Sequence, residues 1–511
     1  MVCTAVLPPE LMPHFGIKAS AYTGNPYTAL VNTTTTVTFN GKPWYIIADN
    51  STAVDAGTVT LLAADTSFGL SEFDSTSPYS NDYSTSTVKA CLDAYTTTGS
   101  FKDVSSAIAD TANGKLYLLS TSEASALPEN LRKIGFTGGN CFYNEWWLRS
   151  QGGDDIYAAF VYGYDGNVFG DGAHVGVEFG VRPALQLDLS KVTFDSSTKT
   201  FTISPWKQLK AAMAAGGEIK LTQNVTAEPD DTALTVLSDK NVILDLNGYT
   251  IDRALTAEKD YGYVIFVGIR GTLTIKDSRT GGIITGGKNT RVGGGIYNNG
   301  GTINIEGGSI TGNTAKYDYS NGGGIYNEGT VNMSGGTISG NKAYRGGAIY
   351  NADITSSDKK STFNMSGGLI TGNEAYNGGG GIYGDYSTFE MSGGSITGNK
   401  SNYGGGIYSF YTTPIFKNGS RITITGNTNK TGTAENNVYI KSTKTIKVDS
   451  GELASGSQIG ISTETAPTEG NPVNITDSYT GSAAFFTSDN TAYTVIKASG
   501  STPAKLAVPP P

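Results

Sequence analysis

The sequence contains few cysteines, few histidines and few charged side chains for its length. Its 511 residues include three cysteines (Cys3, Cys91 and Cys141) and two histidines (His14 and His174), and 16% of the residues are charged. Three scattered cysteines exclude a disulfide-stabilised scaffold and a cysteine-rich metal knuckle, so at most one bridge can form and we expect free, buried thiols. Two histidines argue against a zinc site or a catalytic triad. We therefore expect no metal, no cofactor and no catalytic residue of these classes.

Acidic residues outnumber basic ones, and the sequence has no long apolar run. The formal net charge of −9 argues against a nucleic-acid partner, which would need a basic surface. No apolar run reaches the roughly 20 residues that span a bilayer, so we expect no transmembrane segment. Neither a signal peptide nor an anchor is visible, and the end Val508–Pro511 resembles a linker, so we interpret the chain as part of a longer protein. Its polar, cysteine-poor composition predicts a secreted or cell-surface protein.

What the sequence has in abundance is glycine, tyrosine and a repeat. It contains 68 Gly and 29 Tyr, a composition typical of β structure with many turns. The motif Gly-Gly-(Gly/Ala)-Ile-Tyr recurs at intervals of 29, 24, 33 and 25 residues, and a second motif, Ile-(Thr/Ser)-Gly-Asn, recurs in step with it. The tyrosines of the first motif are Tyr297, Tyr326, Tyr350, Tyr383 and Tyr408, and the asparagines of the second are Asn313, Asn341, Asn373, Asn399 and Asn427.

These intervals predict a mostly β fold, a right-handed parallel β-helix with one triangular coil per repeat. Strand alternation assigns the faces. We expect three inward rows, with the tyrosines pointing outward and the asparagines forming an amide ladder that satisfies the turns. The first row is Ile296, Ile325, Ile349, Ile382 and Ile407; the second is Met333, Met365 and Met391; the third is Ile310, Ile338, Ile370 and Ile396.

The predicted organisation has five parts. A helix begins after a good N-cap, Ser204, and has one apolar face formed by Trp206, Leu209 and Met213, which suits a lid over the first coil. We predict an irregular segment at 1–36, a compact α+β head domain at 37–203, this capping helix at 204–217, the parallel β-helix at 218–440, and irregular terminal coils, a cap and a Pro-rich end at 441–511.

The repeat block resembles the pectate-lyase-like right-handed β-helix proteins, especially bacterial surface proteins rich in such coils. The resemblance covers roughly 206–440 and implies an architecture, because one fold hosts many functions.

The head domain carries three motifs, Lys115–Ala124, Trp146–Ser150 and Gly180–Leu185. With them it resembles an uncharacterised domain common in secreted proteins of gut Gram-positive bacteria. Its ending is similar to C-type-lectin-like and formylglycine-generating-enzyme-like folds, including variable proteins diversified by retroelements. The resemblance implies a ligand-binding head, but the chain lacks the cysteine pair and the acidic calcium loop of sugar-binding lectins. Within the motifs, we expect Trp146, Trp147, Arg149 and Arg182 to be structural, with the arginines in a buried hydrogen-bond network.

Two groups of residues are candidates for ligand contact. The first is a dense aromatic and polar segment of the head, typical of recognition loops, although it also suits an aromatic-rich hairpin that packs under its own domain. Its members are Tyr157, Phe160, Tyr162, Tyr164, Asp165, Asn167, Phe169, Asp171, His174 and Glu178. The second is the tyrosine ladder of the repeats, Tyr297, Tyr326, Tyr350, Tyr383 and Tyr408, which stacks on sugar rings or merely shields the edges of the coils.

The function hypothesis is a non-catalytic, surface-displayed adhesin-type protein of a bacterium or phage, with a glycan or a host or bacterial surface protein as its partner. One alternative is a polysaccharide lyase or glycoside hydrolase on the β-helix face, and another is a retroelement-diversified receptor. The candidate charged residues for catalysis lie in insertion loops and do not recur at matched positions on adjacent coils, which disfavours an enzyme. They are Asp318, Arg345, Asp353, Asp358 and Asp385.

Overall fold

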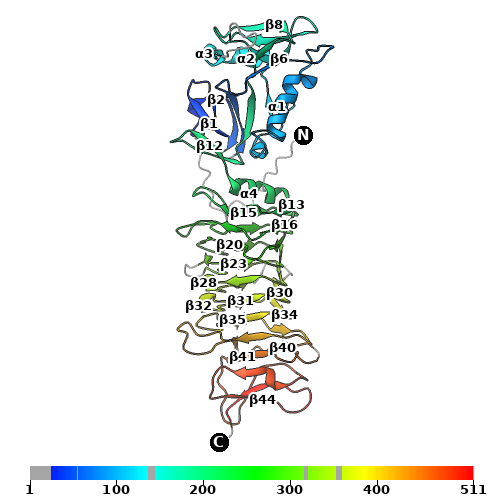
Figure 1. Ribbon diagram of the computed structural model, residues 1–511. Helices are drawn as coiled ribbons and strands as arrows, with labels where there is room; N and C mark the ends of the chain where they lie inside the picture. The colour runs from blue at the N-terminus through cyan, green and yellow to red at the C-terminus, as the bar shows by residue number, and fades with distance from the viewer. Residues whose placement is uncertain are drawn as a thin grey trace. The chain divides into compact units, whose positions relative to one another are not determined.

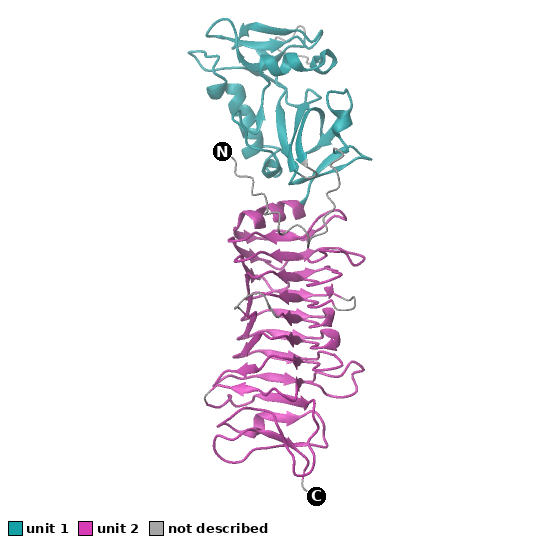
Figure 2. Cartoon of the chain, turned by 180° about the vertical axis from the view of Figure 1, so that it is seen from behind, with its two compact units in different colours: residues 1–204 teal, residues 205–511 magenta. Residues whose placement is uncertain are grey.

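The computed structural model describes residues 25–53, 56–135, 144–315, 320–352, 360–449 and 451–509. The chain divides into two compact units, Met1–Ser204 and Pro205–Pro511, called unit 1 and unit 2 below (Figure 2). Cys3, His14 and Cys141 lie outside the described residues. Cys91 is a free thiol, but it is exposed on a helix and not buried as expected.

Unit 1 contains two β-sheets with short helices (Figure 1). The larger sheet has the order β11 (Val192–Asp195), β12 (Thr200–Ile203), β1 (Thr36–Phe39), β2 (Lys42–Ala53), β3 (Ala56–Ala63), β10 (Ala184–Asp188) and β5 (Leu116–Tyr117). The smaller sheet has the order β4 (Leu70–Glu72), β9 (Glu178–Gly180), β6 (Trp146–Gln151), β7 (Tyr157–Val161) and β8 (Val168–His174). The helices are η2 (Thr28–Leu30), η3 (Tyr83–Thr85), α1 (Thr87–Thr97), η4 (Ser105–Ala107), α2 (Thr121–Ala126) and α3 (Glu129–Arg132).

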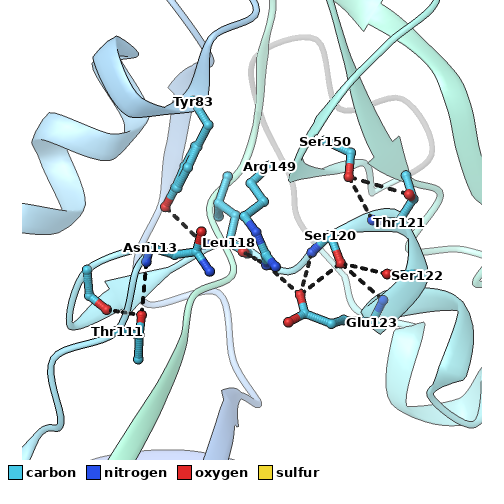
Figure 3. A network of polar contacts seen from close by, with 11 residues as sticks. Tyr83, Thr111, Asn113, Leu118, Ser120, Thr121, Ser122, Glu123, Arg149 and Ser150 are labelled. Carbon is cyan, nitrogen blue, oxygen red and sulfur yellow. Dashed lines mark hydrogen bonds and ion pairs between the residues drawn. The ribbon is translucent and has the colours of Figure 1, made fainter.

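Two of the three motifs of unit 1, Lys115–Ala124 and Trp146–Ser150, meet in a network of polar contacts. Figure 3 shows a network in which the Glu123 carboxylate accepts hydrogen bonds from Ser120 and an ion pair from Arg149, while Arg149 also donates to the carbonyl of Leu118 at 2.7 Å. Ser120 and Glu123 form a capping box at the start of α2, which satisfies backbone donors that a helix terminus leaves open. The network joins α2 to Arg149 and Ser150 in the second half of β6, so these motif residues have structural roles.

Arg182 is fully buried beneath Trp146, whose ring centroid lies 5.0 Å from the guanidinium carbon. It donates to the backbone carbonyls of Ala63 at 2.8 Å and Leu131 at 2.7 Å. Burial lowers the pKa of Arg182 to about 9, so the side chain is still a cation at neutral pH. The structural roles predicted for the tryptophans and for Arg182 are confirmed, and Arg149 is half-buried in the Figure 3 network.

Unit 2 is a parallel β-solenoid of about 9 turns over residues 217–488, which confirms the predicted fold class. Three rows of parallel strands run through it (Figure 1). Row one is β13 (Gly217–Lys220), β16 (Asn241–Asp245), β19 (Thr272–Lys276), β22 (Thr302–Ile305), β26 (Thr330–Met333), β30 (Thr362–Met365), β34 (Thr388–Met391), β37 (Pro414–Phe416) and β40 (Lys447–Val448). Row two is β14 (Val225–Thr226), β17 (Thr250–Asp252), β20 (Ile283–Thr285), β23 (Ser309–Thr311), β27 (Thr337–Ser339), β31 (Leu369–Thr371), β35 (Ser395–Thr397), β38 (Thr423–Thr425) and β41 (Gln458–Thr463).

Row three carries the Ile-Tyr-Asn motif and joins row two at β41, which pairs with both β38 and β39. It is β15 (Leu234–Val236), β18 (Ile265–Val267), β21 (Ile296–Asn298), β25 (Ile325–Asn327), β29 (Ile349–Asn351), β33 (Ile382–Gly384), β36 (Ile407–Ser409), β39 (Val438–Ile440), β41 and β43 (Phe486–Ser488). A short fourth row, β24 (Thr314–Ala315), β28 (Lys342–Arg345) and β32 (Glu374–Gly378), lies before row three in the chain. The strand rows continue well past residue 440, where we expected the regular coils to end.

The aliphatic core of the solenoid is built from residues stacked in register. Ile296 pairs with Ile325, and Ile325 with Ile349, while Met333 pairs with Met365. All three predicted inward rows are buried in one core cluster, which confirms the assignment of faces. Each side chain therefore contacts its own equivalent in the next coil.

Both ends of this core are covered. The predicted capping helix forms as α4 (Pro205–Ala215), and Trp206, Leu209 and Met213 are buried in the solenoid core. At the other end lie η5 (Ala483–Phe485) and an antiparallel sheet of β42 (Val473–Asn474), β45 (Lys505–Ala507) and β44 (Thr494–Ile496). Leu506 of this sheet is buried in the same core.

The predicted asparagine ladder is present and fully buried. The Oδ1 atom of Asn341 accepts from the backbone N–H of Asn313 at 3.0 Å and from its Nδ2 at 3.2 Å. Asn341 donates in turn to Asn373 Oδ1 and to the carbonyl of Ile310, at 3.0 and 2.9 Å. The row ends at the Asp489 carboxylate, which accepts from Asn437. A second buried row, Asn298, Asn327 and Asn351, links consecutive row-three strands.

We predict that Asn341→Ala lowers the free energy of unfolding of the solenoid by about 3 kcal/mol, because it leaves a buried backbone N–H and a buried carbonyl without partners. Asn332→Ala is the matched control, since Asn332 forms a similar amide row with Asn304 and Asn364 at a half-buried position. Its expected loss is about 1 kcal/mol or less. Urea unfolding followed by circular dichroism measures both losses, and equal losses would contradict this account of the ladder.

Candidate functional site

The predicted head segment forms the β7–β8 hairpin at one edge of the smaller sheet of unit 1. Phe160 is buried, and its ring stacks on Phe169 at 5.3 Å and packs at a tilt of 55° against Phe179 at 5.1 Å. Tyr162 packs against Phe169 with ring centroids 4.2 Å apart. Phe160 is thus a core residue, and Tyr162 and Phe169 support the hairpin from its sides. Of the remaining candidates, Asp171 lies within β8 and Glu178 on β9. The others lie at the two ends of the hairpin: Tyr164, Asp165 and Asn167 at the turn, and Tyr157 and His174 at the open end.

The turn end of the hairpin presents Tyr164, which is 70% exposed. The Asp165 carboxylate accepts from the backbone N–H and the side-chain amide of Asn167, at 2.9 and 2.7 Å, so both residues are used to shape the turn. Arg132 Nε donates to the carbonyl of Gly166 and fixes the turn to α3. Tyr164 is therefore a single exposed ring beside a turn in which Asp165 and Asn167 are hydrogen-bonded to each other.

The open end of the hairpin gathers an aromatic group from two distant parts of the sequence. The rings of Tyr79 and Tyr157 are 41% and 36% exposed and both meet the His174 imidazole edge-on, at 5.1 and 6.3 Å. His174 Nδ1 accepts from the backbone N–H of Gly176 at 3.1 Å, which fixes the imidazole between the tyrosines. We call Tyr79, Tyr157 and His174 the Tyr–His cluster.

Buried polar groups hold the loop that carries Tyr79. The Asp74 carboxylate is buried and accepts from the backbone N–H groups of Thr76 and Ser80, at 3.1 and 2.9 Å. The Asn81 side chain donates to the carbonyls of Asp154 and Tyr157, at 2.9 and 3.1 Å. These bonds fasten the loop to the hairpin, so the cluster is preorganised. Tyr79 was missed by the sequence analysis because 78 positions separate it from Tyr157 and no motif links the two.

The surroundings of the Tyr–His cluster are acidic. Asp154, Asp155, Asp171 and Glu178 are exposed, and no lysine or arginine occurs between residues 151 and 181. Within the part of the chain that the structure describes, no group of three or more His, Cys, Asp or Glu side chains is placed to hold a metal ion. The acidic groups therefore give this end of the hairpin a negative field that attracts cations and repels anions.

The tyrosine ladder of the repeats lies on row three of the solenoid, on the side away from the aliphatic core. Successive rings lie 5.1 to 5.6 Å apart. They cover one another: Tyr350, Tyr383 and Tyr408 are buried, and Tyr297 and Tyr326 are half-buried. The tyrosines therefore lie on the outward face, as expected. Most of their ring surface, however, is covered by neighbouring rings and is not open to a ligand.

Two carboxylates accept hydrogen bonds from the ladder. Glu328 accepts from Tyr297 at 2.9 Å and also from Tyr326, and Asp385 accepts from Tyr350 at 2.7 Å. Burial raises the pKa of Glu328. Glu328, Ala352 and Asp385 follow equivalent row-three residues, so they occupy matched positions on successive coils. The coil between Glu328 and Asp385 carries Ala352, so this pair does not contradict the expectation that the candidate charged residues fail to recur at matched positions on adjacent coils. Asp318, Asp353 and Asp358 lie outside the described residues.

Four exposed tyrosines and the half-buried Tyr344 lie on both sides of the ladder, and the sequence analysis missed them. Before row three, the rings of Tyr344 and Tyr376 stack at 5.7 Å, and Tyr403 follows one coil later against Tyr408. After row three, Tyr386 and Tyr411 stack at 4.1 Å. We call these five residues the border tyrosines. The sequence signal for the first three is a tyrosine one to three residues before the glycine run in three consecutive repeats.

Comparison of the chain with protein-family models, with curated proteins and with solved structures finds no match. Among the described residues, no helix combines the length and the apolar character needed to cross a membrane.

We predict that Glu328→Gln changes how the stability of the solenoid depends on pH. Because the folded-state pKa of Glu328 is raised, its contribution is full below the ordinary glutamate pKa and is lost as the pH rises through the raised value. The melting temperature of the wild type relative to Glu328→Gln should therefore fall as the pH rises above the ordinary glutamate pKa of about 4.3. Glu306→Gln, at an exposed site paired with Lys276, should show no such trend, and a constant difference for Glu328→Gln would refute the assignment.

Proposed function

We propose that this chain is a non-catalytic ligand-binding protein of adhesin type, and that its ligand contacts the Tyr–His cluster of unit 1. The observation that supports this proposal most directly is the pair of exposed tyrosine rings held on either side of one imidazole. Tyrosine offers a large amphipathic contact area at a small cost in side-chain entropy, which is why recognition surfaces use it. The solenoid would then serve as a rigid scaffold, because each of its coils is hydrogen-bonded to its neighbours.

The preorganised geometry favours the open end of the hairpin over the turn end. The Tyr–His cluster is fixed by the Asp74 and Asn81 side chains, so little conformational freedom remains to be lost when a ligand binds. Tyr164, in contrast, is a single ring whose polar neighbours are engaged with one another. A binding surface built on hydrogen-bonded loops keeps its shape in the absence of ligand.

The acidic surroundings define the class of ligand. The exposed Asp154, Asp155, Asp171 and Glu178 side chains repel polyanions, so uronate polymers, nucleic acids and anionic membranes are unsuitable partners. An uncharged glycan or a protein surface without excess negative charge fits the cluster. A secreted or cell-surface location and a bacterial or phage source stay predictions from composition and resemblance, as does the alternative of a retroelement-diversified receptor.

Glycoside hydrolysis on the solenoid is a second candidate, supported by the matched positions of Glu328 and Asp385. Two coils separate them, or about 10 Å of backbone, near the carboxylate spacing of inverting glycosidases. The raised pKa of Glu328 suits a general acid. However, both carboxylates accept hydrogen bonds from tyrosines of their own face, which favours a structural role. New reducing ends from a neutral polysaccharide, lost in Glu328→Gln, would support hydrolysis over binding alone.

We predict that the double variant Tyr79→Ala/Tyr157→Ala loses at least tenfold in affinity for the ligand, because it removes both exposed rings of the cluster. The ligand is first identified by applying the whole chain to an array of glycans and proteins. The affinity is then measured by calorimetry for the wild type and the variants.

Tyr164→Ala is the matched control, since it removes an even more exposed tyrosine from the other end of the same hairpin. It should bind with unchanged affinity and melt at the wild-type temperature. If Tyr164→Ala weakens binding while the double variant does not, the site lies at the turn end and the proposal is wrong.

A further inference from the structure

Exposed aromatic side chains in the solenoid are concentrated in a few successive coils. Of the large hydrophobic side chains exposed among the described residues of the coils, Leu237, Tyr261 and Ile269 belong to the first coils. The others are tyrosines between β28 and β39: Tyr376, Tyr386, Tyr403 and Tyr411 are 55%, 47%, 46% and 39% exposed. A concentration of exposed rings on one part of a soluble surface marks a contact site.

The border tyrosines are held in place by stacking. Tyr344 and Tyr376 stack with ring planes 18° apart, and Tyr386 and Tyr411 with planes 17° apart. Lys430 lies over the Tyr376 ring, 3.8 Å from its centroid, and Phe410 meets Tyr411 edge-on at 4.0 Å. The rings therefore present their outer edges in a fixed arrangement.

Tyr386 keeps a backbone conformation that tyrosine rarely adopts. Its φ of 46° lies in the left-handed region, where the Cβ atom crowds the backbone and glycine is favoured. Such strain persists where the surrounding structure enforces it. Tyr261, with a φ of 60°, shares this conformation, so the strain by itself does not mark a ligand site. A glycine at this position would remove the strain, so the tyrosine is present at a cost to the stability of the fold.

The two borders enclose the outer face of row three. Tyr344, Tyr376 and Tyr403 precede strands β29, β33 and β36, whereas Tyr386 and Tyr411 follow β33 and β36. The buried ladder tyrosines form the floor between them. We call this surface, with its two borders, the tyrosine-bordered face.

Charges on this face are balanced by their neighbours. Arg345 lies over the rings of Tyr344 and Tyr383, at 5.6 and 5.3 Å. Lys441 forms an ion pair with Glu464 at 2.7 Å. Asp385, which lies beside Tyr386, accepts a hydrogen bond from the ladder residue Tyr350. Cations (Arg345, Lys430 and Lys441) and anions (Asp385 and Glu464) thus both lie among the aromatic rings, and neither sign dominates.

We propose that the tyrosine-bordered face binds an uncharged polysaccharide whose chain runs along the direction in which the coils stack. The border rings repeat with the coils, about every 4.8 Å, so they match a ligand that also repeats. A sugar polymer offers C–H groups to the exposed ring surfaces and hydroxyl groups to the phenols in every unit, whereas a globular protein surface has no such repeat. This site is separate from the Tyr–His cluster and does not rest on the function proposed for it.

The test measures binding of the whole chain to soluble neutral polysaccharides, namely a β-glucan, a galactomannan and a xyloglucan, by affinity electrophoresis and calorimetry. Polygalacturonate serves as the charged counterpart. We expect binding to at least one neutral polymer and none to polygalacturonate. Tyr376→Ala/Tyr403→Ala and Tyr386→Ala/Tyr411→Ala should each lower the affinity at least tenfold. Tyr261→Ala removes an equally exposed tyrosine of an early coil and should leave it unchanged.

The variant Tyr386→Gly distinguishes a loss of ligand affinity from a loss of fold stability. If Tyr386 is there to bind, this variant loses affinity while its melting temperature stays the same or rises, because the backbone strain is relieved. Tyr79→Ala/Tyr157→Ala should bind the polysaccharide like the wild type, so failure at either site is visible on its own. The proposal is overturned if no neutral polymer binds, if polygalacturonate binds more tightly, or if both tyrosine double variants bind like the wild type.

Discussion

The solenoid depends on the hydrogen bonds that its buried turns make to the next coil. A turn that faces the core has backbone groups that water cannot reach, and only the coils above and below are available to satisfy them. An asparagine amide solves this at every step, because it accepts two hydrogen bonds from one coil and donates to another. The last residue of the row has no further coil to donate a hydrogen bond to. This position is taken by Asp489, whose carboxylate accepts from the backbone N–H of Asn437. Burial raises the pKa of Asp489, so ending the row in a carboxylate has an energetic cost that the asparagines avoid.

The same in-register stacking decides which outward residues remain accessible. A tyrosine that repeats at one position on every coil lies about 5 Å from its equivalents, so the rings cover one another and become a second core outside the first. Accessible rings therefore lie beside the strand row, in the turns, where insertions and strained backbone interrupt perfect repetition. Regular repetition stabilises the solenoid, whereas irregular turns expose side chains, which is why Tyr386 and Tyr411 are exposed and Tyr383 is buried.

Sequence periodicity was sufficient to predict which residues form the rows of the solenoid, but not how exposed the outward tyrosines are. The inward rows of isoleucine and methionine and the Asn313 row follow from alternation and spacing, which are local properties of the chain. Burial of Tyr383 depends on Arg345 and Tyr408, which lie on other coils and reach it only after stacking. In unit 1 the same limit appears in another form: Phe160 and Tyr157 are three positions apart in one aromatic segment, yet one packs on Phe179 and the other is exposed. Alternation already places the two side chains on opposite faces of β7, but only the tertiary fold shows that Phe160 faces a core and that Tyr157 lies at the exposed end of the strand.

Residues that come together from distant parts of the chain are the ones that periodicity cannot find. The Tyr–His cluster needs Tyr79 to be brought to the β7–β8 hairpin, and that placement relies on Asp74 and Asn81, whose roles are visible only as hydrogen bonds. Unit 1 has no repeat, so each of its surface groups has its own supporting contacts and can vary independently. In the solenoid, a change at one coil alters the support of its neighbours. A surface that must discriminate between individual ligands is therefore better placed on unit 1, and one that follows a repeating polymer on unit 2.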